Sequence, residues 1–280
     1  ADPAEVAHGG RLVQPEPVAA FDPDRPVSLG VGLSFAGLEA LGVPAESLAS
    51  FPSEFREGMA ARADYLGDVG ENAPEHWEKP LGSKDVHLVV AALARDTALM
   101  QTLVILAQDA IRDLPGVVPV WQLDVHAPPD GREQFGFQDS ISQPAVEGTG
   151  ILGSNPHEAP LKAGEFVLGY PDETGDVAPI PQPEVLGRNG TYVAFRKLHQ
   201  RVASFRTYLN ECAADPAEAA WLAAKFVGRW PSGAPLALAP DKDDPELGAD
   251  LARVGLPSAE LAAFKARMEA DAKLLSLRLM

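Results

Sequence analysis

The sequence has one cysteine, few basic side chains and no long apolar segment. The single thiol, Cys212, cannot form a disulfide within the chain or a cysteine-based metal site, which fits a reducing compartment. We expect Cys212 to be a buried or half-buried thiol beside a helix. No uninterrupted apolar run reaches the roughly 18 residues that a membrane helix needs, so no membrane span is expected.

The opening residues, ADPAEVAHGG, contain neither the basic region nor the apolar region of a signal peptide. They also lack an initiator methionine, which is compatible with a processed protein or with an excerpt from a longer one. The missing signal peptide and the single cysteine together predict a cytoplasmic location.

The charge of the chain is strongly negative. Lys and Arg together number 23, Asp and Glu number 40, and the net charge is −17. Such a surface repels phosphate backbones, so a nucleic-acid partner is not expected. The apolar content of 46% over 280 residues is sufficient for the core of one large domain or of two ordinary ones.

Motifs of several common enzyme classes are missing as well. The six histidines include no pair three or four residues apart and no HExxH pattern, so no zinc site is expected and no metal ligand is assigned. His199, in the basic stretch RKLHQR, is expected to be a solvated helix residue. The sequence contains no GxSxG nucleophile elbow, no P-loop and no dinucleotide fingerprint.

The middle of the first half predicts a strand–helix–strand unit. The apolar run 85–93 predicts a buried strand, and Asp96 is a good cap for an amphipathic helix that ends at Pro115-Gly116. A second apolar run, 117–127, predicts another strand. We expect these two strands to pair beneath the helix, as in a split β-α-β unit.

The flanking segments complete the organisation. Upstream, the patterns predict a strand at 27–35, a short helix at 34–41, a helix at 50–67 and a loop at 67–83. Downstream, they predict a loop-rich stretch at 149–191, a strand at 191–198, a helix with Leu198, Val202, Phe205 and Leu209 on one face, and a helix from Asp215 to Gly228. The resulting divisions are an irregular lead-in at 1–26, a first unit at 27–148, a loop-rich insertion with the start of a second unit at 149–245, and a helical segment at 246–280.

One short stretch, EQFGFQDSISQPAVEG at 133–148, places a carboxylate close behind two aromatic rings. One interpretation is that Asp139 makes an Asx-type turn, because Asp and Ser before Pro are common in turns. The other is functional: Phe135 and Phe137 enclose the carboxyl group, burial raises its pKa, and it exchanges a proton near neutral pH. The residues alone leave both interpretations open.

The same stretch resembles the signature of the dye-decolorizing peroxidases, a haem peroxidase family with the pattern Gly-x-x-Asp-Gly. Gly136 and Asp139 match its first Gly and its Asp, and Ser140 stands at the second Gly. Further blocks resemble the longer, fungal-like branch of the family in the same order, namely 67–93, 164–175, 189–205 and 227–245.

The resemblance implies an α+β fold of two ferredoxin-like units, the dimeric α/β barrel type, with antiparallel sheets and helices packed on one face. It implies haem b as cofactor, hydrogen peroxide as oxidant and small aromatic compounds, phenolic or dye-like, as reductants, and it leaves a homo-oligomer open. Asp139 is the implied catalytic residue, which moves a proton between the two oxygens of bound peroxide as the O–O bond breaks. The residues implied to line the haem are Gly136, Phe137, Ser140, Ile141, Ser142 and Gln143, with Arg229 as a propionate contact or a structural loop residue.

The sequence departs from the family pattern in two respects. The family's proximal histidine and distal arginine follow the GRWxSGAP block, whereas no histidine follows His199 here, and the second ferredoxin-like unit looks incomplete. We therefore expect this chain by itself to bind haem weakly or not at all. The alternative is a haem-less relative that serves as a scaffold or binding module. Ser140 in place of glycine costs about 1 kcal/mol if this position requires a positive φ.

Overall fold

The computed structural model describes residues 27–94, 96–112, 114–125, 130–141, 143–150, 153 and 159–254. These residues form two compact units, each built from two separate segments of the chain. Unit 1 takes its residues from Ala1–Asp124 and Lys162–Ala194, and unit 2 from Val125–Leu161 and Phe195–Met280. The division into 27–148, 149–245 and 246–280 stays a prediction.

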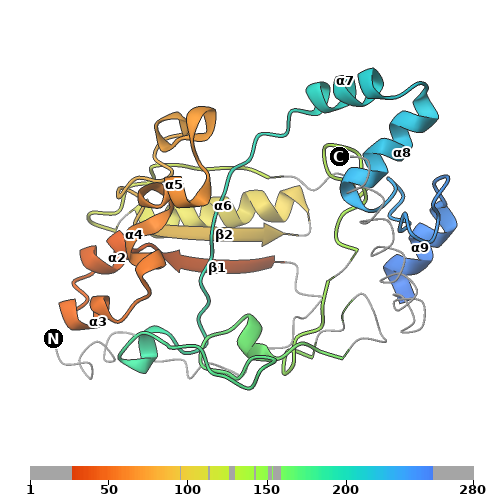
Figure 1. Ribbon diagram of the computed structural model, residues 1–280. Coiled ribbons are helices and arrows are strands. Elements are labelled where there is room, and N and C mark those ends of the chain that lie inside the picture. Colours follow the sequence, from red (N-terminus) through yellow and green to blue (C-terminus); the bar gives the residue numbers. More distant parts are fainter. Residues whose placement is uncertain are drawn as a thin grey trace. The chain divides into compact units, whose positions relative to one another are not determined.

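Unit 1 contains the only sheet found among the described residues, a pair of antiparallel strands (Figure 1). β1 (Val27–Leu33) and β2 (Leu88–Ala94) align from the Val27–Ala94 pair to the Leu33–Leu88 pair. Both segments are rich in Val and Leu, which pack well on a pleated surface. The strands predicted at 27–35 and 85–93 are confirmed, and with the helices they give an α+β architecture.

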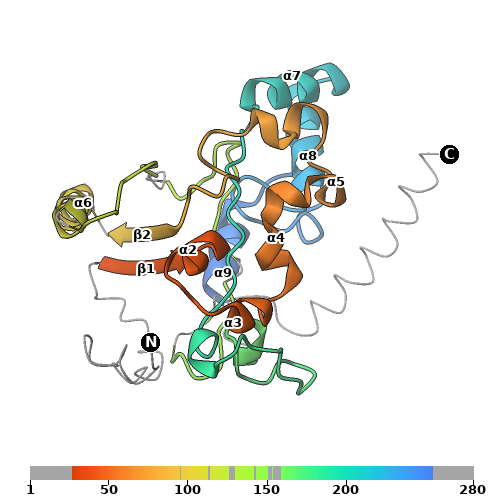
Figure 2. The same ribbon diagram turned by 90° about the vertical axis from the view of Figure 1, so that its left-hand side faces the viewer.

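Helix α6 (Thr97–Arg112) follows β2 and lies beside it, as Figure 2 shows with the helix close to end-on. Its start is fixed locally, because Asp96 Oδ1 accepts a hydrogen bond from the Leu99 N–H at 2.9 Å. Gly116, with a φ of +83°, lies in the turn that follows. The predicted helix with its Asp96 cap is confirmed.

The second strand predicted in this unit is wrong. Residues 117–125 form no strand, and β2 pairs with β1 instead; residues 126 and 127 lie outside the described part. Pro119 interrupts the apolar run and has no N–H to donate to a strand ladder. The segment is held by a side chain, since Trp121 Nε1 donates to Glu78 Oε1 at 2.7 Å.

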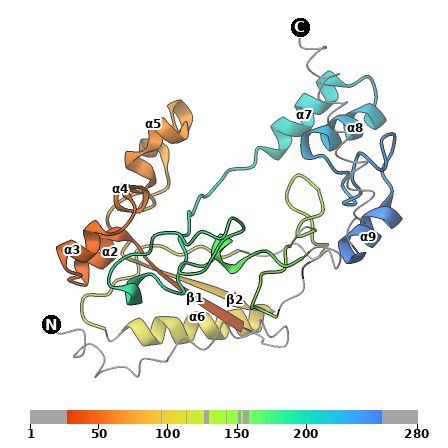
Figure 3. The same ribbon diagram turned by 60° about the horizontal axis from the view of Figure 1, so that its bottom comes forward.

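A group of short helices follows β1 (Figure 3). Ser34 caps the first of them: its Oγ accepts from the Gly37 N–H at 3.0 Å and donates to the Val86 carbonyl at 2.6 Å. A Cβ on Gly37 would lie 2.1 Å from the His87 carbonyl oxygen, so this close approach requires glycine. The group consists of α2 (Phe35–Ala40), α3 (Ala45–Ala49), α4 (Ser53–Ala61) and α5 (Ala63–Leu66).

The helix predicted over 50–67 is thus divided into α4 and α5, and Gly58 interrupts α4 with a φ of +74°. Aromatic rings pack along this region: Phe55 lies 5.3 Å from both the Phe51 and the Tyr192 ring centroids. Tyr192 belongs to the strand predicted at 191–198, which the structure does not contain. The prediction of that strand is wrong, because its residues find no partner strand among the described residues.

Where they are described, the predicted loops at 67–83 and 149–191 contain short 3₁₀ turns and isolated β-bridges but no α-helix and no strand. One of these loops is tied to α3, because the Gln182 N–H donates to Ser50 Oγ at 2.8 Å. The turns are η1 (Gly70–Asn72), η2 (Pro74–His76), η3 (Ala163–Glu165) and η4 (Glu184–Leu186).

Unit 2 is helical, with α7 (Val202–Cys212), α8 (Pro216–Val227) and α9 (Pro245–Val254). The predicted cap of α8 is confirmed: Asp215 Oδ1 accepts from the N–H groups of Ala217 and Glu218 at 2.8 and 2.9 Å. Leu198 lies before α7 rather than on its face. The helical segment predicted at 246–280 is described only as far as the end of α9.

Two buried clusters form the core of unit 2. One joins α7 and α8 to the motif segment through Phe137, Leu209, Ala219 and Ala223. The other packs the end of α8 against the following turn through Ala224, Trp230, Ala234 and Leu236. Cys212, which was expected to be buried or half-buried, is exposed at the last position of α7.

In the described part of the chain, no helix has both the length and the apolar character needed to cross a membrane.

Candidate active site

The motif of unit 2 forms a tight turn centred on Gly136. The Gly136 N–H donates to the Glu133 carbonyl at 2.8 Å, and the Glu133 N–H donates to the Phe137 carbonyl at 2.9 Å. Gly136 has a φ of +102°, which a residue with a side chain rarely adopts. The turn is attached to the loop after α8, because the Gln138 N–H donates to the Pro231 carbonyl at 3.1 Å.

The carboxylate of Glu133 organises this turn. It accepts hydrogen bonds from the backbone N–H groups of Phe135 and Phe137 at 2.8 and 2.9 Å, and from Gln200 Nε2 at 2.8 Å. Burial acts to raise the pKa of Glu133, but these hydrogen bonds favour the charged form and outweigh it, so that the pKa lies below its ordinary value. Glu133 therefore holds the residues on both sides of Gly136 in place.

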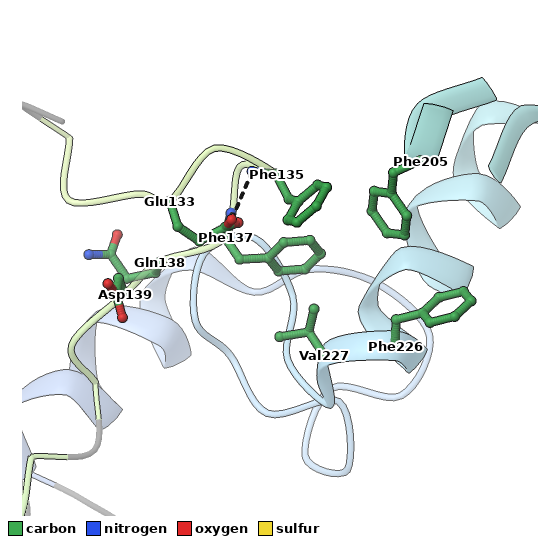
Figure 4. Close-up of a pocket in the computed structure, with 8 residues that line it drawn as sticks. All are labelled: Glu133, Phe135, Phe137, Gln138, Asp139, Phe205, Phe226 and Val227. Carbon is green, nitrogen blue, oxygen red and sulfur yellow. Dashed lines mark hydrogen bonds between the residues drawn. The ribbon is translucent and has the colours of Figure 1, made fainter. Parts of the chain in front are cut away.

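Four phenylalanine rings line a pocket beside the turn (Figure 4). The Phe135 and Phe205 ring centroids lie 5.0 Å apart, and those of Phe205 and Phe226 lie 5.8 Å apart. The pocket has a volume of about 410 Å³. Its lining consists of Glu133, Phe135, Phe137, Gln138, Asp139, Phe205, Phe226 and Val227.

Asp139 lies at the edge of this pocket. Its side chain is exposed, and in Figure 4 its carboxylate points away from the rings of Phe135 and Phe137. Oδ1 accepts a hydrogen bond from the Ser140 N–H at 2.7 Å, and no described residue donates to Oδ2. The expectation that the two rings enclose the carboxyl group is not met, because the rings pack toward α7 and α8 instead.

Of the other residues expected at the site, some belong to the motif turn and others lie away from the pocket. Gly136 and Phe137 belong to the turn, and Phe137 is only 5% exposed. Ile141 lies next to the turn after α8, because a Cβ atom added to Gly233 would lie 2.6 Å from Ile141 Cδ1. Gln143 is exposed and, like Ile141, does not line the pocket, and Ser142 lies outside the described residues.

Arg229 is half-buried in the turn after α8. Its Nη1 donates to the Gly233 carbonyl at 2.8 Å, and burial lowers the pKa of its guanidinium. No carboxylate among the described residues forms an ion pair with it. The hydrogen bond within its own turn agrees with a structural role, and the propionate contact stays a prediction.

The sequence pattern did not indicate Glu133, Phe205, Phe226 or Val227 as pocket residues. Phe205 was identified as a residue on an apolar helix face, which by itself does not place it beside Phe135. One sequence feature could have indicated Glu133: an acidic residue shortly before a glycine turn can accept hydrogen bonds from the N–H groups of that turn.

Comparison with known proteins finds relatives with a similar sequence and fold. Peroxidase 2 of Mycetinis scorodonius is 35% identical over 229 residues, which are 80% of this chain and 42% of that protein. The dye-decolorizing peroxidase of Mycena epipterygia is 32% identical over 80% of this chain and 41% of its own length. The crystal structure of the dye-decolorizing peroxidase of Auricularia auricula-judae matches with a TM-score of 0.66 at 30% identity, over 82% of this chain and 50% of that one.

Over about 80% of its length, the chain is similar in sequence and fold to the dye-decolorizing peroxidases. No family model matches it. The expected ferredoxin-like α+β fold class is confirmed by these structural neighbours. The chain spans less than half the length of the curated relatives it matches and about half of the solved structures.

The family implies a haem, and the described pocket residues provide only part of what a haem needs. The rings of Phe135, Phe137, Phe205 and Phe226 offer an apolar wall. The lining contains no histidine, cysteine, tyrosine or methionine, and no metal-binding group of three His, Cys, Asp or Glu occurs in the described part of the chain. The described residues therefore do not by themselves fit a haem, because the pocket lining contains none of the usual haem-iron ligands.

The contribution of Glu133 to stability is expected to depend on pH. A depressed carboxyl pKa in the folded protein stabilises it above the ordinary pKa of 4.5, and this stabilisation is lost as the pH falls through the folded value. Glu133→Gln is expected to lower the free energy of unfolding at neutral pH by about 1 kcal/mol. In this variant the free energy of unfolding should also fall less steeply than in the parent between about pH 5 and pH 3. Urea unfolding followed by tryptophan fluorescence measures both effects. Glu211→Gln, at an exposed position of α7, is the control and should change neither.

Ser140 adopts a φ of +60°, a conformation that favours glycine. Ser140→Gly is therefore expected to raise the free energy of unfolding by about 0.5–1 kcal/mol, because it relieves backbone strain. Ser204→Gly, inside α7, should have the opposite effect of about the same size. Equal destabilisation by both substitutions in urea unfolding would show that Ser140 makes a contact that offsets its strain.

Proposed function

We propose that this chain provides the motif-bearing part of a haem-dependent peroxidase of the dye-decolorizing type. In such an enzyme, hydrogen peroxide takes up electrons and protons from phenolic or dye-like compounds and becomes water. The observation that carries the proposal is the Gly136–Asp139 motif at the edge of an aromatic pocket, in a chain 35% identical over 229 residues to Peroxidase 2.

Asp139 is proposed as the proton-transferring residue. A general base must reach the proton that it abstracts. Asp139 meets this requirement because its side chain is exposed and no described residue donates a hydrogen bond to its Oδ2. Glu133 is already occupied by three hydrogen bonds, so it is the weaker candidate although it lines the same pocket. Glu133 is instead a positioning residue for the turn that carries Asp139.

The phenylalanine rings are proposed to bind a flat aromatic group. Edge and face contacts with aromatic side chains stabilise such a group by about 0.5–1.5 kcal/mol per ring pair. The pocket walls at Phe135, Phe205 and Phe226 support this role. Haem b is the cofactor that the family implies, with its iron ligand supplied from outside the described residues.

The test uses the protein purified from its native host, so that its cofactor and partners are retained. We expect a Soret band and peroxide-dependent oxidation of a phenol and of an anthraquinone dye. A Soret band without oxidation would contradict the proposed activity. If neither appears, the alternative of a haem-less scaffold or binding module replaces the proposal; nothing in the comparisons favours that alternative at present.

The bacterially produced chain alone provides a second measurement. We expect titration with haem to give no sharp, stoichiometric change in the Soret band, because the described pocket lining contains none of the usual haem-iron ligands, His, Cys, Met or Tyr. Tight stoichiometric binding would show that this chain contains an iron ligand after all. Replacing His199 with alanine in that case tests whether it is the ligand.

A further inference from the structure

The pocket of unit 2 combines aromatic walls with charge of one sign (Figure 4). Besides its four phenylalanines, the lining contains two ionisable side chains, Glu133 and Asp139, and both are carboxylic acids. No lysine, arginine or histidine belongs to the lining. We call this cavity the aromatic pocket. Its volume of about 410 Å³ is in the range of sites for small molecules.

The rings of the aromatic pocket are arranged so that their faces do not cover one another. Phe135 and Phe205 meet edge to face with an interplanar angle of 68°, and Phe205 and Phe226 with one of 81°. An edge-to-face pair hides the face of only one ring. Phe226 is 60% exposed, so that a ligand can reach it. The face of an aromatic ring carries partial negative charge and attracts a cation.

The carboxylates strengthen this preference for positive charge. The hydrogen bonds from Phe135, Phe137 and Gln200 hold Glu133 in its charged form, because they keep its pKa below the ordinary value. Glu133 is half-buried, so its charge is screened less than that of a fully solvated group. Asp139 adds an exposed carboxylate at the edge of the same pocket.

The basic side chains of the surrounding segments do not line the pocket. Lys225 of α8 lies 4.7 Å from the centroid of the Trp221 ring, which is not part of the lining. Arg132, Arg206 and Arg229 belong to the same segments but are also outside the lining. A cleft with apolar walls and charges of one sign concentrates ligands of the opposite sign. The net charge of −17 acts in the same direction.

We propose that the aromatic pocket binds flat aromatic cations, such as positively charged dyes and protonated aromatic amines, in preference to anionic dyes. The phenylalanine rings contact the flat ring system, and the carboxylates of Glu133 and Asp139 attract its positive charge. The assignment of this ligand as the reductant of the enzyme rests on the proposed function. Binding itself requires neither haem nor peroxide.

The experiment compares two flat three-ring compounds of opposite charge on the purified chain. Methylene blue is the cation and anthraquinone-2-sulfonate is the anion. Calorimetry at an ionic strength of about 0.15 M limits attraction to distant surface charges, since the Debye length is then about 8 Å. We expect saturable one-to-one binding of methylene blue, at least about tenfold tighter than binding of the sulfonate.

Phe226→Ala tests the rings without a change of charge. We expect it to weaken the binding of methylene blue by about 3- to 30-fold. Phe166→Ala is the matched control, because Phe166 is 41% exposed but belongs to unit 1 and does not line the pocket. It should leave the affinity unchanged. Circular dichroism should show that both variants fold like the parent chain.

Asp139→Asn tests the charge at the edge of the pocket. It should weaken the binding of methylene blue by at most about fivefold, because the carboxylate is exposed, and should not weaken binding of the sulfonate. Asp241→Asn makes the same change of net charge at an exposed position outside the lining. Equal effects of the two substitutions would mean that the overall charge, and not the pocket, attracts the cation.

Three further results would overturn the proposal. They are the absence of saturable binding of methylene blue, binding of the sulfonate as tight as that of methylene blue, and equal losses of affinity in Phe226→Ala and Phe166→Ala. Oxidation of a phenol by the native protein, together with any of these results, would overturn this inference alone. Selective binding of methylene blue by the chain, with no oxidation by the native protein, would instead overturn the proposed function and leave the ligand preference of the pocket established.

Discussion

Replacing Phe137 with alanine is expected to lower the free energy of unfolding of unit 2 by about 3–5 kcal/mol. Phe137 is 5% exposed and packs against Leu209, Ala219 and Ala223. The substitution removes apolar surface from the core and leaves a cavity between the motif turn and the two helices. Urea unfolding followed by tryptophan fluorescence reports this loss, because Trp221 and Trp230 belong to the same unit.

Phe226→Ala is the control for this prediction. The Phe226 side chain is 60% exposed but still contacts the Phe205 and Tyr208 rings. Its removal should cost at most about 1.5 kcal/mol. A loss for Phe137→Ala no larger than that for Phe226→Ala would mean that the motif segment does not form part of the core.

Asp139→Asn is expected to slow the first reaction of the haem-bearing protein with hydrogen peroxide by about 10²–10⁴-fold. An amide of the same shape cannot take up the proton that the carboxylate exchanges. Haem binding should change little, because Asp139 is not an iron ligand in this proposal. Stopped-flow absorption in the Soret region gives the rate, and the haem-to-protein ratio gives the binding.

Asp241→Asn serves as the matched control, since Asp241 is exposed and lies far from the motif in sequence. It should leave the rate unchanged. A rate for Asp139→Asn equal to that of the parent would favour the other interpretation of this residue, a turn in which Oδ1 accepts from the Ser140 N–H. Loss of haem from the variant would assign Asp139 a role in binding rather than in proton transfer.

The capped helices could be predicted from the sequence because their signals are local. Asp96 and Asp215 accept hydrogen bonds from N–H groups two or three residues ahead, as predicted from their positions before amphipathic runs. The glycine after α8 has a φ of +81°, as a helix end requires.

Strand pairing could not be predicted in the same way. The segments 117–125 and 191–198 have the apolar content of strands, but a strand forms only where a partner offers matching backbone groups. β2 takes its partner from residues 27–33, about sixty positions earlier in the chain, and no local pattern encodes that choice.

The motif identified Gly136 and Asp139 from sequence, because Gly-x-x-Asp is a fixed spacing within one turn. The sequence by itself thus indicated the resemblance to the dye-decolorizing peroxidases, the helix caps and the position of the proposed proton-transferring residue. Only the tertiary structure decided that Phe205 and Phe226 join Phe135 at the pocket, that Glu133 holds the turn, and that Asp139 is exposed. The physical reason is range: caps and turns depend on neighbours within a few residues, whereas burial and ring contacts depend on segments that are some seventy or more residues apart in the chain.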